Sequence, residues 1–244
     1  MRGPSTTQST TGSGRLTDAP FAPPAAGGGR GGGGGGGGRG GGATLAWEPG
    51  IGGCESGFTI PDPTDADIVW ASCYGNKLTR WDAKTRSARS VSPWMITLDS
   101  PPNESRYRCH WTSPVAIDPL DHKNVYYGCQ VVFKTTNDGQ TWKEVSPDLS
   151  HRDPSKIISS GGVVGDNLGQ FAPEVVFAIA PSPIQKGLLW AGTNDGKLWY
   201  SRDGGENKNG WTDVSANIKG MPELGTISKI DPSTFDAGTA YIAV

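Results

Sequence analysis

The sequence has no run of about 18 apolar residues, and its first twenty residues lack the apolar segment of a signal peptide. Charges of the two signs nearly balance, with 22 Lys and Arg against 24 Asp and Glu and an isoelectric point near 5.9. Because basic residues are not in excess, the sequence gives no reason to expect a polyanionic binding partner. We therefore predict no membrane span and no nucleic-acid partner.

Motifs for metals and cofactors are also missing. The histidines show no His-x-His or His-Glu-x-x-His spacing, and the four cysteines include no Cys-x-x-Cys, so a zinc site is not predicted. The glycine-rich run at 27–42 lacks the Lys-Ser/Thr of a phosphate loop. We expect no metal and no cofactor.

The first 42 residues differ in composition from the rest. Fourteen of the 37 glycines lie between Gly27 and Gly42, interrupted only by Arg30 and Arg39. Such a segment buries too little apolar surface to offset its ordering entropy. With two arginines and no aromatic residue, the run at 27–42 is not typical of an RNA-binding tract. We predict that residues 1–42 form a disordered glycine-rich leader.

From residue 43 onward the chain repeats. Prolines 63, 119, 181 and 232 follow similar apolar segments at intervals of about fifty to sixty residues, a period typical of propellers or solenoids. Each repeat contains an apolar strand, a turn, an aromatic-rich strand, a Gly or Asn turn, a third strand and a short fourth strand. Four strands make one propeller blade, and a first strand apolar on both faces suits a position near the propeller axis.

The predicted fold class is therefore all-β, a partial β-propeller of about three and a half four-stranded blades. The blades fall near residues 54–95, 109–150, 171–216 and 225–244, and the last is truncated. Any helix is expected to be a single turn within the 94–107 or 161–173 insertions. Because the sequence stops on apolar residues typical of the middle of a strand, 241–244, we interpret it as an interior fragment.

Two turns carry the most specific motif. Both resemble the Asp-box, Ser/Thr-x-Asp-x-Gly-x-x-Trp, in which a side chain caps the turn, glycine takes a positive φ and Trp packs between sheets. The second-repeat copy has Asn in place of Asp, and the third-repeat copy reaches its Trp after three extra residues. We assign these positions structural roles: Thr135, Asn137, Gly139, Trp142, Ser201, Asp203, Gly205 and Trp211.

The chain from about residue 47 to 244 resembles the bacterial Asp-box (bacterial neuraminidase repeat) proteins related to the sortilin propeller, often labelled glycosyl hydrolases. The stretches that carry the resemblance include 52–58, 80–86, 133–142, 145–150 and 187–193. The resemblance implies an extracytoplasmic protein of many blades, whose remaining blades are partners of this segment. It also implies that the Asp-box turns lie on the outer rim, away from a ligand.

Two functions follow as alternatives. The first is binding of a glycan or peptide through the axial face; the second is glycoside hydrolysis at a site shared with blades outside this chain. A sialidase would need an arginine cluster, a Tyr with an acidic partner and an acid Asp. It also usually carries an early Phe/Tyr-Arg-Ile/Leu-Pro motif, which is missing. Arg106 and Arg108 could hold an anion, although a solvated pair of loop residues is the commoner interpretation. No residue is identified as catalytic.

Ligand contacts are predicted on the loops that precede each first strand and follow each second strand, since these loops share one face. The candidates on those loops are Glu55, Tyr74, Asn76, Arg108, His110, Trp111, Gln130, Asp166 and Glu174.

The four cysteines occupy equivalent positions, or stations, in two successive repeats. Cys54 precedes a first strand and Cys73 ends the following second strand, and Cys109 and Cys129 occupy the same stations one repeat later. Antiparallel pairing places the start of one strand beside the end of the next, so we predict disulfides Cys54–Cys73 and Cys109–Cys129. Such bridges indicate a periplasmic or secreted protein. Four buried free thiols are the alternative.

Overall fold

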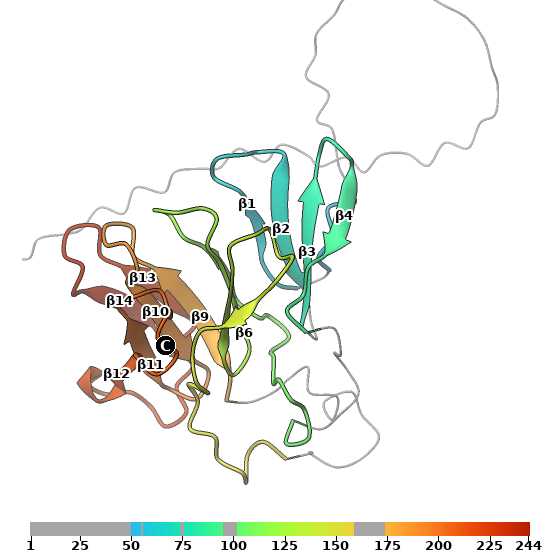
Figure 1. Cartoon of the computed structure of the whole chain (residues 1–244). Helices are drawn as coiled ribbons and strands as arrows, with labels where there is room; N and C mark the ends of the chain where they lie inside the picture. The colour runs from blue at the N-terminus through green and yellow to red at the C-terminus, as the bar shows by residue number, and fades with distance from the viewer. Residues whose placement is uncertain (1–49, 55, 74–75, 95–101, 159–173) are drawn as a thin grey trace, which may run out of the picture. The chain divides into compact units, whose positions relative to one another are not determined.

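The computed structural model describes residues 50–54, 56–73, 76–94, 102–158 and 174–244 (Figure 1). The predicted leader, residues 1–42, lies outside them. The described chain is all-β, with three four-stranded antiparallel sheets and one two-stranded sheet, which confirms the predicted partial propeller. Within each sheet the strands follow one another in chain order, because each connection is a short turn between antiparallel neighbours.

The strands fall at the same four stations in each sheet. The first sheet contains β1 (Thr59–Pro61), β2 (Ile68–Cys73), β3 (Lys77–Asp82) and β4 (Ser87–Ser90). The second contains β5 (Val115–Ile117), β6 (Val125–Gly128), β7 (Val132–Thr135) and β8 (Lys143–Glu144).

The third sheet contains β9 (Val176–Pro181), β10 (Leu189–Thr193), β11 (Leu198–Ser201) and β12 (Thr212–Asp213). The last has only β13 (Lys229–Pro232) and β14 (Ala240–Ala243). A 3-10 helix, η2, covers Ser215–Asn217. This turn lies outside the two insertions in which single helical turns were expected, because it forms where the chain leaves β12.

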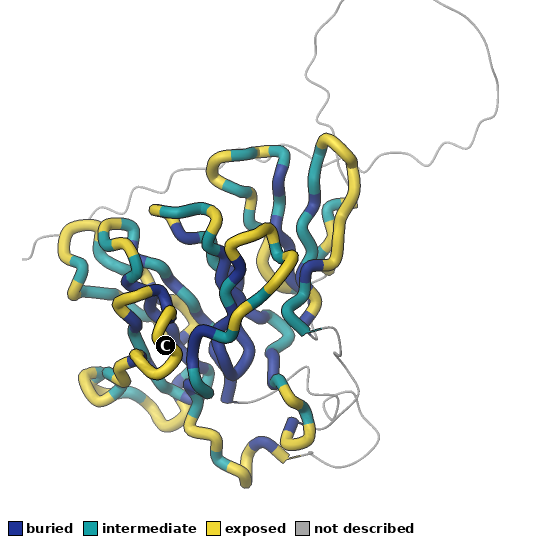
Figure 2. The backbone as a smooth tube through the Cα atoms, viewed as in Figure 1, coloured by how far each residue is buried: buried dark blue, intermediate teal, exposed yellow. Residues whose placement is uncertain are grey.

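Three apolar clusters hold successive sheets together. Each cluster combines residues of two neighbouring sheets: Leu78 with Tyr127, Val132 with Leu189, and Leu198 with Ile230. The second strands are almost wholly buried, whereas β4 is exposed along its length, as Figure 2 shows. First strands also neighbour one another, since β9 contacts both β5 and β13. Face-to-face sheets with adjacent first strands are the arrangement of propeller blades.

The two Trp-bearing turns join neighbouring sheets in the same way. In the 135–142 turn, Gly139 N donates to Thr135 Oγ1 at 3.1 Å and Trp142 Nε1 donates to the carbonyl of Val91 at 2.7 Å. Its Asn137 Oδ1 accepts the Thr141 amide at 3.0 Å. The turn is therefore capped from within and fixed by its indole to the preceding sheet.

The 201–211 turn repeats this geometry despite its three extra residues. Gly205 N donates to Ser201 Oγ at 3.0 Å, Asp203 Oδ2 accepts the Asn207 amide at 3.0 Å, and Trp211 Nε1 donates to the carbonyl of Val145 at 2.7 Å. Gly205 has φ +77°, and a Cβ there would lie 2.6 Å from the Val145 carbonyl oxygen. Only glycine fits this close approach.

Candidate functional site: the loop face between the second and third sheets

The site lies at the end of the sheets where first and third strands begin and second and fourth strands end. Both disulfides are here: Cys54–Cys73 with Cα atoms 5.2 Å apart and Cys109–Cys129 with Cα atoms 4.1 Å apart. They are the pairs that the repeated stations predict. Covalent closure at this end fixes the loops from which the polar side chains project. Two disulfides also indicate an oxidising compartment.

Arg108 is the centre of a buried polar cluster. Its guanidinium Nη2 lies 2.8 Å from Asp148 Oδ2 and donates to Ser150 Oγ and to the carbonyl of Glu174, both at 3.2 Å. Its backbone amide donates to Gln130 Oε1 at 2.8 Å. The side chain is only 6% exposed, so the interpretation of Arg108 as a solvated loop residue was wrong. A buried charge of this kind requires its ion pair.

Glu174 joins the cluster to the third sheet. The residue is 2% exposed and has φ +57°, and its Oε2 accepts the Asp153 amide at 2.6 Å. Among the described residues, no hydrogen bond reaches its Oε1. Burial raises the pKa of Glu174 above its ordinary value, the Asp153 amide opposes this shift, and the charge of Asp195 adds to it. Burial therefore disfavours ionisation of the Glu174 carboxyl group.

Asp195 and His151 form the outer part of the site. Asp195 Oδ2 accepts the His151 amide at 2.7 Å and lies 3.1 Å from His151 Nδ1, and its Oδ1 accepts the Thr193 hydroxyl. The Asp195 side chain is 3% exposed, whereas that of His151 is 46% exposed. The buried carboxylate thus holds a histidine that faces solvent.

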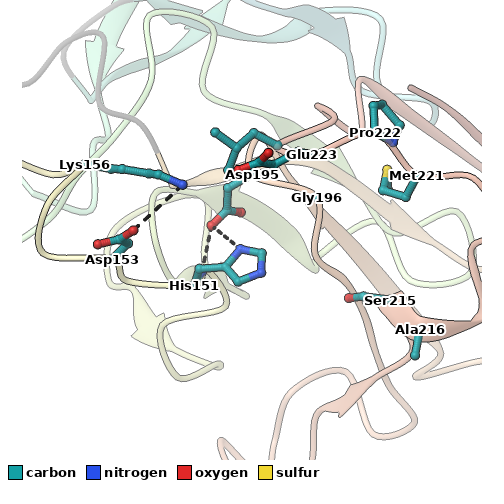
Figure 3. A pocket seen from close by; sticks show the side chains of 11 residues that line it. His151, Asp153, Lys156, Asp195, Gly196, Ser215, Ala216, Met221, Pro222 and Glu223 are labelled. Carbon is teal, nitrogen blue, oxygen red and sulfur yellow. Dashed lines mark hydrogen bonds and ion pairs between the residues drawn. The ribbon is translucent and has the colours of Figure 1, made fainter.

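A pocket of about 580 Å³ opens beside this pair (Figure 3). One side of it is polar, with Lys156 Nζ 3.8 Å from Asp153 Oδ2. The loop that follows η2 supplies Met221, Pro222 and Glu223. Carboxylate oxygens accept hydrogen bonds, so this side of the pocket is suited to a ligand that brings donors.

Of the nine predicted contact residues, the structure brings three together: Arg108, Gln130 and Glu174. Asn76 is buried beside the Cys109–Cys129 disulfide, with φ +67° and its amide donating to the carbonyl of Trp94. Its Oδ1 lies 4.0 Å from Cys129 Sγ.

His110 makes local contacts instead, because its Nδ1 accepts the Thr112 amide at 3.1 Å and its ring packs edge-on against Phe177. Burial lowers the pKa of His110. Trp111 is partly buried. The other three candidates, Glu55, Tyr74 and Asp166, lie outside the described residues.

Sequence reasoning missed Asp148, His151, Asp153 and Asp195. The signal for Asp195 was present, because it follows a second strand at the same station as Gln130. The other three follow a fourth strand, which ends on the same face, but only loops around the first and second strands were considered. In the described ranges, no group of three or more His, Cys, Asp or Glu is arranged to hold a metal ion. No helix of those ranges is long and apolar enough to cross a bilayer.

Fold and site together define the class of protein: it is a partial β-propeller with two disulfides and a polar pocket on its loop face. No protein-family model matches the chain, and no curated protein matches it. Solved structures do resemble it. The GH74 enzyme of Niastella koreensis has 21% identity and a TM-score of 0.47, with 79% of this chain and 27% of that one covered.

Two further structures have similar values. An auxiliary nutrient binding protein from Bacteroides thetaiotaomicron has 12% identity and a TM-score of 0.44, with 80% of this chain and 36% of that one covered. The GH74 xyloglucanase from Xanthomonas campestris has 18% identity and a TM-score of 0.41, with 71% and 24% covered. The chain thus spans 24% to 36% of the length of these proteins. At these identities and scores, none of their activities is carried over.

Proposed function

We propose that this chain is a segment of an extracytoplasmic Asp-box propeller, similar to sortilin, that binds a glycan or peptide through its loop face. Residues 1–42 are its leader and 43–244 its blade region, with blades near 54–95, 109–150, 171–216 and 225–244. The observation that carries the proposal is the pocket lined by His151, Asp153 and Asp195. It adjoins the buried Arg108 cluster through Glu174, which accepts the Asp153 amide with its carboxylate and the Arg108 guanidinium with its carbonyl.

The chemistry of the pocket selects the ligand. Its wall has the carboxylates of Asp153, Asp195 and Glu223 against the single ammonium of Lys156. Glycan hydroxyls and the cationic side chains of a peptide both donate hydrogen bonds to carboxylates. Met221 and Pro222 give the same pocket an apolar side for the ligand's carbon framework.

The compartment belongs to the proposal as well. Disulfides persist in oxidising environments, and we place the protein in the periplasm or outside the cell on that ground. The remaining blades of a full-length propeller are its proposed structural partners, as the resemblance to the Asp-box proteins implies.

A second candidate is glycoside hydrolysis, with the active site shared with blades outside this chain. The observation in its favour is Glu174, whose pKa is raised by burial and by the charge of neighbouring Asp195. Glycosidases pair a protonated carboxylic acid with an ionised carboxylate across the scissile bond. Glu174 with Asp153 or Asp195 would supply such groups.

Binding is tested with the whole chain on immobilised glycans and on a set of peptides that differ in basic residues. Asp153→Asn and Glu223→Gln in the pocket should weaken binding about tenfold each, since each removes one charged acceptor. Asp231→Asn, on the exposed surface of β13, is the matched control and should bind normally. Glycan retention with no peptide retention identifies a glycan as the ligand, and the reverse identifies a peptide. Equal effects of the three substitutions would refute the pocket.

Hydrolysis is tested separately, with chromogenic glycosides and polysaccharides. Turnover that falls at least about 100-fold in Glu174→Gln, with ligand binding retained, would favour the hydrolase over the binding protein. Binding without turnover by the protein with all its blades would exclude it.

A further inference from the structure

A groove lies between the second and third sheets, at the end of the strands opposite the loop face. It is bordered by the turns that join β5 to β6 and β9 to β10, and by the two Trp-bearing turns. The groove has an inner pocket of about 450 Å³ and an outer pocket of about 240 Å³. Lys134, Thr136 and Glu206 line both, so the two pockets adjoin. We call them together the turn-face groove.

One side of the groove is a row of side chains on the second sheet. Tyr126, Lys134 and Lys143 are neighbours on β6, β7 and β8, because the register pairs Tyr126 with Lys134 and Lys134 with Lys143. The Lys134 ammonium lies 5.9 Å from the centre of the Tyr126 ring. Glu206, from the Trp-bearing turn of the third sheet, binds Lys134 at 2.8 Å and Lys143 at 3.1 Å. The charge of the two lysines is therefore largely compensated within the protein.

The other charged groups of the groove are engaged as well. Lys186 Nζ lies 3.7 Å from Asp121 Oδ2, and the Arg202 guanidinium lies 5.0 Å from the centre of the Tyr200 ring. Asp203 accepts amides of its own turn with both carboxylate oxygens. An ionic ligand would have to compete with these contacts, so the groove favours neither an anion nor a cation.

Two polar atoms of the inner pocket have no hydrogen-bond partner within the described ranges. Tyr126 is 1% exposed, and no described residue forms a hydrogen bond with its hydroxyl group. Asp118 is 4% exposed; its Oδ1 accepts the Leu120 amide at 2.9 Å, whereas no described donor reaches its Oδ2. Both residues line the inner pocket. Because polar groups of buried residues normally have partners, the pocket holds one donor and one acceptor that a ligand can satisfy.

A glycine keeps the space in front of the tyrosine open. A Cβ at Gly204 would lie 3.2 Å from Tyr126 Oη and 3.6 Å from Lys134 Nζ. Gly204 has φ +66°, and its amide donates to the carbonyl of Gly187 at 2.7 Å. Burial, and then the charge of Asp118, raise the pKa of Tyr126, so its hydroxyl group remains a donor.

We propose that the turn-face groove binds a neutral oligosaccharide, with one sugar hydroxyl accepting from Tyr126 and another donating to Asp118. Hydroxyl groups both donate and accept hydrogen bonds, and they bring no charge that the groove would have to compensate. In the outer pocket, the partly buried ring of Trp142 offers an apolar surface for a second sugar unit. The site is independent of the ligand pocket on the loop face, since the two lie at opposite ends of the strands.

The test uses the full chain, with short neutral gluco-, xylo- and manno-oligosaccharides as probes. Isothermal titration calorimetry measures binding, and amide hydrogen exchange locates it. Tyr126→Phe removes only a hydroxyl group, and Asp118→Asn removes the charged acceptor. The matched control is Tyr127→Phe, because Tyr127 points to the opposite face of the same strand and is fully buried in the cluster between the first and second sheets.

We expect a neutral probe to bind and to slow amide exchange at 134–136 and 202–206. Tyr126→Phe should weaken binding about fivefold and Asp118→Asn about tenfold, since each removes one hydrogen bond and the second of these is to a charged group. Tyr127→Phe should bind normally. The affinity should be the same at low and high salt, because the ligand carries no charge. Tyr126→Phe should keep the wild-type Tm without ligand, because no described residue bonds the hydroxyl group that it removes.

Failure of all the neutral probes to bind would overturn the proposal. So would binding that Tyr126→Phe and Asp118→Asn leave unchanged, or protection confined to the loop face at 151–156 and 194–197. A lowered Tm of ligand-free Tyr126→Phe would assign its hydroxyl group a structural role and would also count against the site. Tighter, salt-dependent binding of acidic oligogalacturonides would overturn the proposal in favour of an anion site.

Discussion

Replacement of Trp211 tests how much one contact between neighbouring sheets stabilises the fold. The side chain is 7% exposed, and its Nε1 donates to the carbonyl of fully buried Val145 at 2.7 Å. Among the described residues, no other donor reaches that carbonyl. Trp211→Phe keeps most of the apolar contact and leaves the carbonyl unsatisfied, at a cost of about 1–3 kcal/mol.

Trp211→Ala removes the ring as well. Replacement of a buried aromatic residue by alanine costs about 3–5 kcal/mol through lost transfer free energy and the cavity left behind. The free energy of unfolding should therefore fall by about 2 kcal/mol in Trp211→Phe and by about 4–5 kcal/mol in Trp211→Ala. For a domain of this size, the smaller loss lowers Tm by about 4–8 °C.

Urea unfolding followed by circular dichroism measures both losses, and an unchanged m-value shows that the unfolded states are comparable. The matched variant is Trp142→Phe. It breaks the equivalent hydrogen bond, from Trp142 to the carbonyl of Val91, and Trp142 is only partly buried. Its loss should be smaller, because Trp142 is only partly buried and its replacement gives up less buried apolar contact. A Trp211→Phe variant as stable as the wild type, or less perturbed than Trp142→Phe, would refute the assignment of the indole hydrogen bond as a structural link.

Three further outcomes are expected. Replacing Cys109 and Cys129 by alanine should cost about 3 kcal/mol of unfolding free energy, the chain-entropy value for a loop of this length, and a denaturation midpoint that matches the oxidised protein would contradict it. Because the pKa of Glu174 is raised on folding, its stabilising contribution is complete below the unfolded value near 4.5 and is lost as pH rises through the folded pKa. The stability of the wild type relative to Glu174→Gln should therefore fall as pH rises above about 4.5, and a constant difference in urea titrations would count against the buried site. Gly205→Ala should destabilise by at least about 2 kcal/mol more than Gly220→Ala, since both have positive φ but only the former meets neighbouring atoms; equal melting temperatures would show that sterics play no part.

The blade pattern was readable from the sequence because it rests on local rules. Alternating and apolar strands separated by Asp, Asn and Gly turns recur three times, and each side chain that defines them acts within its own hairpin. The same holds for Cys54 and Cys73, whose stations meet through one antiparallel pair. A Val-Ser dipeptide directly follows the fourth strand of each complete sheet and is equally visible in the sequence, at 91–92, 145–146 and 214–215.

The polar site depended on the tertiary structure. Arg108 and Asp148 lie on loops of the second sheet, whereas Glu174 and Asp195 lie on loops of the third. Packing of the two sheets lets Arg108 donate to the Glu174 carbonyl and places His151 against Asp195. From the sequence alone, Arg108 was interpreted as an exposed loop residue. Packing buries its guanidinium group, and a buried charge requires an ion-pair partner, which Asp148 provides. Local chemistry fixes strands, turns and disulfide stations, whereas the burial and pairing of charges are properties of the assembled interface between sheets.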